Sequence, residues 1–188
     1  MQRTIFNTPV INYCMHWLSR LLLRLAGWHV EGVAPTAPKY VLIAAPHTSN
    51  WDFPLTLMVC RALRLNICWM GKGSLVPPIV GGVMAWLGGI PVHRDRVGNL
   101  VQSMVNALDC NPQMAIVVSP EGTRSNLVHW KTGFYHIALG ANVPIALGYL
   151  DFKGKVAGIG RLLQPSGNIA SDMAEIRGFC ADITGKNP

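Results

Sequence analysis

His47 and Asp52 are the residues of this sequence whose types and spacing most directly suggest chemistry. They are separated by four residues in the run Pro46-His47-Thr48-Ser49-Asn50-Trp51-Asp52. Imidazole has an unperturbed pKa of about 6.5, close to working pH, so a histidine here could remove the proton from an attacking hydroxyl group. A nearby carboxylate could hold the other ring nitrogen and stabilise the imidazolium that forms, as in a serine-protease triad. The pair therefore predicts a general base and its orienting carboxylate.

Alternative interpretations of the pair are a structural contact and a metal site. Isolated His and Asp residues at this spacing are a weak signal, and most such pairs have structural roles. A metal site fits less well, because the pair supplies two ligands and no third ligand stands at a diagnostic distance. The sequence also lacks the Gly-x-Ser-x-Gly elbow of a serine nucleophile, so no covalent enzyme intermediate is required. We expect neither a metal nor a cofactor.

A second cluster follows in the run Ser119-Pro120-Glu121-Gly122-Thr123-Arg124-Ser125. A ligand that carries a phosphate needs cations around it, and the planar fork of an arginine can hold two phosphate oxygens. Arg124 stands in this cluster, Lys72 follows a predicted strand, and Arg94 ends the run 89–94. The alternative for each is a solvated surface charge, the usual environment of a lone Lys or Arg.

These residues need a scaffold that brings distant segments together. Residues 40–45 form a continuous apolar run, as expected for a strand that is covered on both faces of a parallel sheet. His47 would then lie just past the carboxyl end of this strand. Ser49 or Asn50 could cap the helix that follows, and Asp52 would fall in or next to its first turn, where the helix dipole favours a carboxylate.

Predicted strands and helices alternate along the rest of the chain. Further strands are expected at 67–70, 90–93, 114–119, 143–149 and 153–163. Helices are expected at 53–65, 79–87, 97–108, 131–139 and 173–180, followed by a loose end. This alternation predicts an α/β fold with a mostly parallel central sheet flanked by helices. Ligands of such sheets bind at the carboxyl ends of the strands, so His47 and Glu121 should meet at one edge.

Composition limits the class of protein. With 188 residues, 50% hydrophobic and 13% charged, the chain suits one compact domain. Sixteen Lys and Arg against nine Asp and Glu give a formal charge of +7, which favours anionic partners. A mean hydropathy of +0.29 with so few charges favours a membrane surface, and we expect no nucleic-acid partner. The five cysteines are scattered and odd in number, which indicates reduced thiols in a cytosolic compartment.

The segment 8–28 predicts an amphipathic helix. Polar residues recur at every fourth position along one side of it: Asn12, His16, Arg20 and Arg24. Such a helix could lie in a membrane interface with its arginines toward lipid phosphates, or it could pack on the domain as an ordinary helix. Charges interrupt its apolar stretch, so a signal peptide is not expected. We divide the chain into an interfacial segment at 1–30 and a single domain at 31–188, peripheral or monotopic on the cytoplasmic face of the cell membrane.

Together the two clusters resemble the signature of the glycerolipid acyltransferases of phospholipid biosynthesis, which esterify lysophosphatidic acid. The resemblance covers roughly residues 32–151 and comprises four blocks in family order: His47 with Asp52, the run 89–94, Glu121-Gly122-Thr123-Arg124, and Val143-Pro144-Ile145. It implies that His47 is the catalytic base and Asp52 its partner. It also implies that Arg94 helps to bind the glycerol phosphate and that the fourth block lies near the acyl site.

The resemblance implies an O-acyltransferase that moves a fatty acyl group from acyl-CoA or acyl-carrier-protein to the hydroxyl of a lysophospholipid. The foremost acceptor is 1-acylglycerol-3-phosphate, which would give phosphatidate. The donor is then a co-substrate, and the expected partners are the donor, the lysophospholipid and the membrane lipid surface. The expected substrate-binding residues are Lys72, Arg94, Glu121, Gly122, Thr123 and Arg124. Backbone N–H groups at the start of the helix after His47 are candidate donors to the tetrahedral oxyanion.

Three positions depart from the family pattern. Many members have Asn where this chain has Pro46, Phe where it has Ser119, and Asp where it has His93. These departures leave another lipid hydroxyl open as the acceptor. A catalytically silent protein that binds anionic lipid and a hydrolase are the rival classes. The presence of both His47 and Asp52 favours an enzyme over the silent protein.

Overall fold

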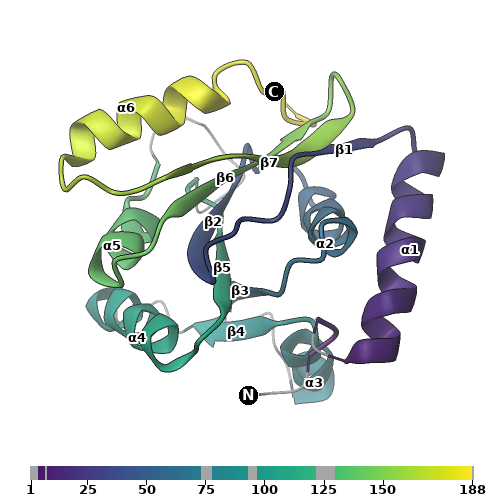
Figure 1. Cartoon of the computed structure of the whole chain (residues 1–188), viewed down its shortest axis with the longest axis horizontal. Helices are drawn as coiled ribbons and strands as arrows, with labels where there is room; N and C mark the ends of the chain where they lie inside the picture. The colour runs from purple at the N-terminus through teal and green to yellow at the C-terminus, as the bar shows by residue number, and fades with distance from the viewer. Residues whose placement is uncertain (1–3, 7, 73–77, 93–96, 122–129, 188) are drawn as a thin grey trace.

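The computed structural model describes residues 4–6, 8–72, 78–92, 97–121 and 130–187, which are the coloured parts of Figure 1. In this part of the chain, seven strands form one sheet in the order β1-β7-β6-β2-β5-β3-β4. The strands are β1 (His29–Glu31), β2 (Lys39–Ala45), β3 (Ile67–Lys72), β4 (Gly89–Val92), β5 (Met114–Val118), β6 (Ile145–Asp151) and β7 (Val156–Leu163). All neighbours pair in parallel except β6 and β7, which are antiparallel. The expected mostly parallel sheet is confirmed.

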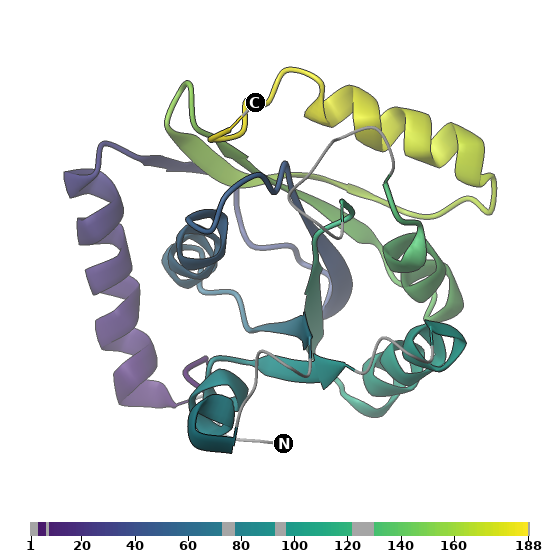
Figure 2. The same cartoon turned by 180° about the vertical axis from the view of Figure 1, so that it is seen from behind.

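Helices cover both faces of this sheet. They are α1 (Pro9–Leu25), α2 (Asp52–Ala62), α3 (Pro78–Trp86), α4 (Val97–Cys110), α5 (Gly133–Gly140) and α6 (Ile169–Cys180). Figure 1 shows α4, α5 and α6 on one side of the sheet and α2 on the other, with α1 outside α2, and Figure 2 shows the same layers from behind. None of the helices described is both long and apolar enough to cross a bilayer.

The position of β2 in the middle of the sheet explains why residues 40–45 are apolar without a break. Val41 and Ile43 point into the core beneath α4 and α5, where both are fully buried. Tyr40 and Leu42 point the opposite way, into the core beneath α2. Successive side chains of a strand face opposite sides, so a strand covered on both faces has no position left for a polar residue.

Several element boundaries differ from those expected. The three-residue strand β1 was not predicted, because so short a segment carries no readable period. Helix α2 begins at Asp52 and ends at Ala62, earlier than expected, since Arg64 adopts a positive φ of 58° that ends the helix. The N-cap of α2 is Trp51, not Ser49 or Asn50. The strand expected at 153–163 starts only at Val156.

Helix α1 lies on α2, and its polar stripe is divided between contacts with the protein and the exposed surface. His16 is buried and its Nδ1 atom donates to the backbone carbonyl of Arg61, 3.1 Å away, while the Arg61 guanidinium donates to the Asn12 side chain. Asn12 and His16 therefore contact the protein, and only Arg20 and Arg24 of the stripe are exposed. The buried Arg61 needs polar partners, so the part of the stripe at Asn12 and His16 is packed on the domain, as one of the two alternatives expected.

Helix α6 is joined to α5 through a buried carboxylate. The Tyr135 hydroxyl of α5 donates to Asp172 Oδ2 at 2.8 Å, and the backbone N–H of Ser166 donates to the same oxygen at 2.7 Å. Burial opposes ionisation of Asp172, but these hydrogen bonds outweigh it and lower the pKa of the carboxyl. The chain that leaves α6 therefore starts from a firmly anchored helix.

Candidate active site

His47 and Glu121 meet at one edge of the sheet, as expected. Strands β2 and β5 are parallel neighbours, with Ile43 opposite Val118, so their carboxyl ends lie together. His47 follows the end of β2 and Glu121 follows the end of β5. The backbone N–H of His47 donates to Glu121 Oε1 at 3.2 Å. Parallel pairing alone thus brings together two residues that are 74 positions apart in the sequence.

His47 is also in contact with Asp52. Its Nδ1 atom lies 3.1 Å from Asp52 Oδ2. The histidine side chain is 23% exposed and the aspartate side chain 3%, so the ring is accessible while its carboxylate partner is buried. With Nδ1 donating to the carboxylate, Nε2 keeps the lone pair that can accept a proton. This is the geometry of a general base with an orienting carboxylate.

The loop itself holds the Asp52 carboxylate. The same Oδ2 atom accepts the backbone N–H groups of Thr48 and Ser49, each at 2.7 Å. Such charge-assisted bonds are short and about twice as strong as neutral ones. Asp52 is the first residue of α2, where the helix dipole also favours a negative charge. The buried carboxylate is thereby held in place independently of His47.

The hydrogen bonds inside this loop limit which backbone N–H groups could bind an oxyanion. The expected donors are the N–H groups at the start of the helix after His47. The N–H groups of Thr48 and Ser49 are occupied by Asp52, and that of Trp51 donates to the Ser49 hydroxyl at 3.0 Å. The N–H groups of these three residues, which precede the start of α2, are thus already hydrogen bonded within the loop. A buried carboxylate oxygen needs donors, and the nearest N–H groups supply them to Asp52 Oδ2, whereas Oδ1 has no hydrogen-bond partner in the part of the chain that the structure describes.

Glu121 is buried beside this pair. Burial raises the pKa of its carboxyl group, the nearby Asp52 charge adds to the rise, and the hydrogen bonds to backbone N–H groups together with the charge of His47 oppose it. The net direction is upward. Its observed contact is with the backbone of His47, so Glu121 has a part in holding the loop that the sequence did not indicate.

The other predicted site residues are placed only in part. Lys72 is the last residue of β3, a strand that pairs with β5 next to β2. Arg94, Gly122, Thr123 and Arg124 lie outside the described residues. Within the described ranges, no three His, Cys, Asp or Glu side chains gather into a group that could hold a metal ion.

Two neighbours of the site went unrecognised in the sequence. Burial raises the pKa of the Cys180 thiol to about 12, and the nearby Glu121 carboxylate adds to the shift, so the end of α6 lies close to the site. Beyond it, Asn187 donates to Thr48. The expected loose end is therefore wrong. No pattern in residues 181–187 signals this contact, because it depends on where α6 ends in space.

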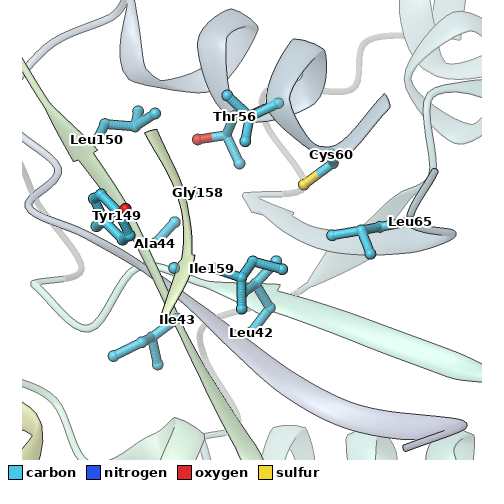
Figure 3. A pocket seen from close by; sticks show the side chains of 12 residues that line it. Leu42, Ile43, Ala44, Thr56, Cys60, Leu65, Tyr149, Leu150, Gly158 and Ile159 are labelled. Atoms are coloured by element: carbon cyan, nitrogen blue, oxygen red, sulfur yellow. The ribbon is translucent and has the colours of Figure 1, made fainter. Parts of the chain in front are cut away.

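Two cavities lie on the α2 side of the sheet. One of about 20 Å³ separates Thr56 and Cys60 of α2 from Leu42 and Ile159 of the sheet (Figure 3), and it has room for about one water. The other, of about 210 Å³, lies between α1 and α2. Its lining is mainly apolar: Ile5, Phe6, Met15, Ser19, Pro54, Leu57, Met58, Arg61 and Leu87. Only the second cavity could accept part of a hydrocarbon chain.

Comparisons with known proteins bear on the family and the fold of this chain. The model of the Acyltransferase family matches residues 28–146. The chain is 26% identical over 149 residues to the 1-acyl-sn-glycerol-3-phosphate acyltransferase of Haemophilus influenzae, and 31% identical over 140 residues to that of Escherichia coli. These matches take in 74% and 69% of this chain but 60% and 55% of the relatives, so the chain spans little more than half of their length.

A solved structure gives the same result for the fold. The crystal structure of the 1-acyl-sn-glycerophosphate (LPA) acyltransferase PlsC from Thermotoga maritima superposes with a TM-score of 0.58 at 15% sequence identity. The superposition covers 93% of this chain and 82% of that one, so the two share an α/β fold. Since the family model takes in residues 28–146 of the 188, the chain belongs to the Acyltransferase family.

Replacing Glu121 by Gln should change how stability depends on pH. The raised pKa means that the folded state binds a proton more tightly than the unfolded state, so wild-type stability falls as pH rises from the ordinary carboxyl value through the folded value. Gln does not titrate and keeps an oxygen for the His47 N–H. The free energy of unfolding, measured with urea between about pH 4 and about pH 7, should therefore rise in E121Q relative to wild type as pH increases. A difference that stays constant or shrinks would contradict the assignment.

Proposed function

We propose that this protein is an O-acyltransferase that esterifies a lysophospholipid at a membrane surface, with 1-acylglycerol-3-phosphate as acceptor and phosphatidate as product. The observation that carries the proposal is the accessible His47 ring, held by the buried Asp52 at the sheet edge of a chain from the Acyltransferase family. The names of the Haemophilus influenzae and Escherichia coli relatives support the choice of acceptor. The donor is acyl-CoA or acyl-carrier-protein.

The proposed reaction needs one base. Nε2 of His47 removes the proton from the acceptor hydroxyl as its oxygen attacks the thioester carbonyl. Asp52 stabilises the imidazolium and keeps Nδ1 as the donor. When the tetrahedral intermediate collapses, the thiolate of the donor leaves and receives the proton from the imidazolium. An oxygen–carbon bond forms and a sulfur–carbon bond breaks, so no covalent enzyme intermediate is involved.

The anionic acceptor requires positive charge close to His47. Lys72, Arg94 and Arg124 are proposed to supply it, and Gly122 and Thr123, which directly precede Arg124 in the sequence, are proposed to bind the substrate with them. The position of Lys72 at the end of β3, one strand from β5, supports its inclusion. The chain's formal charge of +7 is consistent with an anionic substrate at an anionic surface.

The reaction is tested by incubating the purified protein with acyl-CoA or acyl-carrier-protein and a panel of lysolipids, with products identified by mass spectrometry. We expect acylation of 1-acylglycerol-3-phosphate, and a fall in kcat of at least about a hundredfold in H47Q. His136, an exposed histidine of α5, provides the matched control as H136Q, which should keep wild-type turnover.

Three outcomes would contradict the proposal in different ways. Near wild-type turnover in H47Q would refute the assigned base. Release of free fatty acid without esterification would indicate a hydrolase, in which water replaces the alcohol. Salt-dependent vesicle binding without any product would indicate a silent lipid-binding protein.

Membrane binding is proposed to occur through α1. Its outward face carries large exposed apolar side chains, which are Val10, Ile11, Tyr13, Trp17, Leu18, Leu21, Leu22 and Leu25. A continuous exposed apolar surface of this kind marks an interaction site. Arg20 and Arg24 flank it, and their exposed charges suit anionic headgroups. Because the cytoplasmic leaflet is anionic, these charges support our proposal of peripheral or monotopic attachment to that face, with the segment 1–30 as the interfacial unit.

Replacing Leu21 by Glu should weaken vesicle binding without affecting the fold. Leu21 is 54% exposed, so the change removes no core contact, but it places a charge where an apolar side chain would enter the interface. Since burial of a leucine contributes about 1.5–3 kcal/mol, partitioning onto anionic vesicles should fall roughly tenfold or more. L139E, on the exposed side of α5 across the sheet, is the control and should bind like wild type. Equal binding of L21E and wild type in a sedimentation assay would exclude α1 as the contact.

The 210 Å³ cavity between α1 and α2 is proposed to hold part of an acyl chain. It reaches Pro54, two positions after Asp52, so one end of it lies within the first turns of the helix that carries the site. Its lining is mainly apolar, which suits a hydrocarbon and not a phosphate. Leu57 and Met58 form its wall on α2.

Replacing Leu57 by Trp should shift the enzyme toward shorter donors. The larger side chain would fill part of the cavity and leave less length for a chain, so kcat/KM for a palmitoyl donor should fall relative to that for a decanoyl donor. Overpacking costs about 1–3 kcal/mol, so the unfolding temperature is measured alongside. L162W, at a partly exposed position of β7, should leave the ratio unchanged. An unchanged ratio in L57W would place the acyl chain elsewhere.

A further inference from the structure

The chain after α6 returns to the loop that carries His47. Both views draw the end of the chain above the loop between β2 and α2 (Figures 1 and 2). Two hydrogen bonds attach the returning chain to the end of β6 at Thr184, and we call this attachment the anchor. The N–H of Phe152 donates to the Thr184 carbonyl at 2.8 Å, and the N–H of Thr184 donates to Asp151 Oδ1 at 3.2 Å. Asp151 ends β6, the parallel neighbour of β2 on the side away from β5. The anchor therefore lies at the same sheet edge as His47.

The three residues that follow Thr184 all contact the loop between β2 and α2. They are Gly185, Lys186 and Asn187, and we call them the 185–187 segment. Asn187 holds Thr48 twice, because its backbone N–H donates to Thr48 Oγ1 and its Nδ2 donates to the Thr48 carbonyl, both at 3.2 Å. Lys186 Nζ lies 4.9 Å from the centre of the Trp51 ring, within the range of a cation–π contact.

Gly185 approaches the loop more closely than any other residue type could. A Cβ atom at this position would lie 2.6 Å from Thr48 Oγ1, 2.7 Å from Thr48 Cγ2 and 3.3 Å from Pro46 Cγ. The Thr48 side chain is β-branched and its oxygen accepts the Asn187 N–H, so it cannot turn away without losing that bond. The glycine is therefore required for the close approach.

Thr48 is the residue through which this contact reaches the site. It follows His47 directly, and its own N–H donates to Asp52 Oδ2 at 2.7 Å. Its peptide groups are thus held on one side by the buried carboxylate and on the other by Asn187. Glu121 holds the preceding N–H, that of His47. The backbone on both sides of the His47 side chain is fixed by Asp52 within the loop and by Glu121 and Asn187 from two distant parts of the chain.

We propose that the 185–187 segment is a positioning element for His47: it fixes Thr48 so that the imidazole keeps its Nδ1 atom on Asp52 and presents Nε2 to the acceptor. The inference rests on the proposed function for its catalytic consequence, but its geometric part stands on the contacts of Thr48. Gly185 and Asn187 are positioning residues and do not touch the substrate.

Two variants disturb the segment in different ways. N187D keeps the shape of the side chain but replaces the Nδ2 donor by an oxygen that faces the Thr48 carbonyl. G185V forces a side chain against Thr48. Each has a matched control: N111D removes an equivalent bond, from Asn111 Nδ2 to the Ala107 carbonyl at the end of α4, and G178V adds a side chain on α6 where nothing lies within 4 Å.

The first measurement is the tautomer of His47, read from the ring nitrogen resonances of protein labelled with ¹⁵N-histidine and assigned with H47Q. Wild type, N111D and G178V should show the Nδ1–H form, in keeping with the contact to Asp52. N187D and G185V should show a mixture of the two tautomers. A purely structural role for the segment would lower the unfolding temperature without changing the tautomer.

The second measurement is kinetic. In N187D and G185V, kcat should fall roughly tenfold to a hundredfold while KM for donor and acceptor changes little, because misplacement of the base affects the transition state more than binding. Unchanged tautomer and unchanged kcat in both variants would overturn the inference. A wild-type protein without acyl transfer would overturn the proposed function instead, and the tautomer measurement would still decide the role of the segment.

Discussion

A single carboxylate oxygen organises this protein's site. Asp52 Oδ2 contacts the His47 ring nitrogen at 3.1 Å and accepts the N–H groups of Thr48 and Ser49 at 2.7 Å. Because the aspartate is buried, its charge needs these donors, and the loop must close around it to provide them. The contact from Nδ1 holds the imidazole ring on this carboxylate. Loss of the arrangement would leave a buried charge without donors and the ring of His47 without its partner.

The sheet supplies the setting in which this loop can work. Parallel strands end at the same edge, so Glu121 after β5, Asp151 at the end of β6 and His47 after β2 gather there. Each contributes something different: Glu121 accepts the His47 N–H, and Asp151 anchors the chain that returns to Thr48. The outward apolar face of α1 and the cavity between α1 and α2 lie on the α2 side of the same sheet.

Prediction from sequence worked where a pattern had one physical solution. The apolar run that became β2 could only be a doubly covered strand, and the alternation of strands and helices left a parallel sheet as the simple arrangement. For α1 it left two orientations open, because the spacing of Asn12 and His16 defined a polar stripe but not its direction. That direction depends on Arg61, a buried cation 49 positions from Asn12, which no local period can reveal.

The sequence by itself determined the fold class, the His47–Asp52 pair and the family resemblance, because each rests on residue types at fixed local spacing. Tertiary structure decided which backbone N–H groups remain free near the base, which face of α1 points outward, and that the 185–187 segment touches Thr48. These features depend on the meeting of segments far apart in the chain. The spacing of residues along the sequence does not predict such contacts, since they depend on how helices and strand ends pack in space.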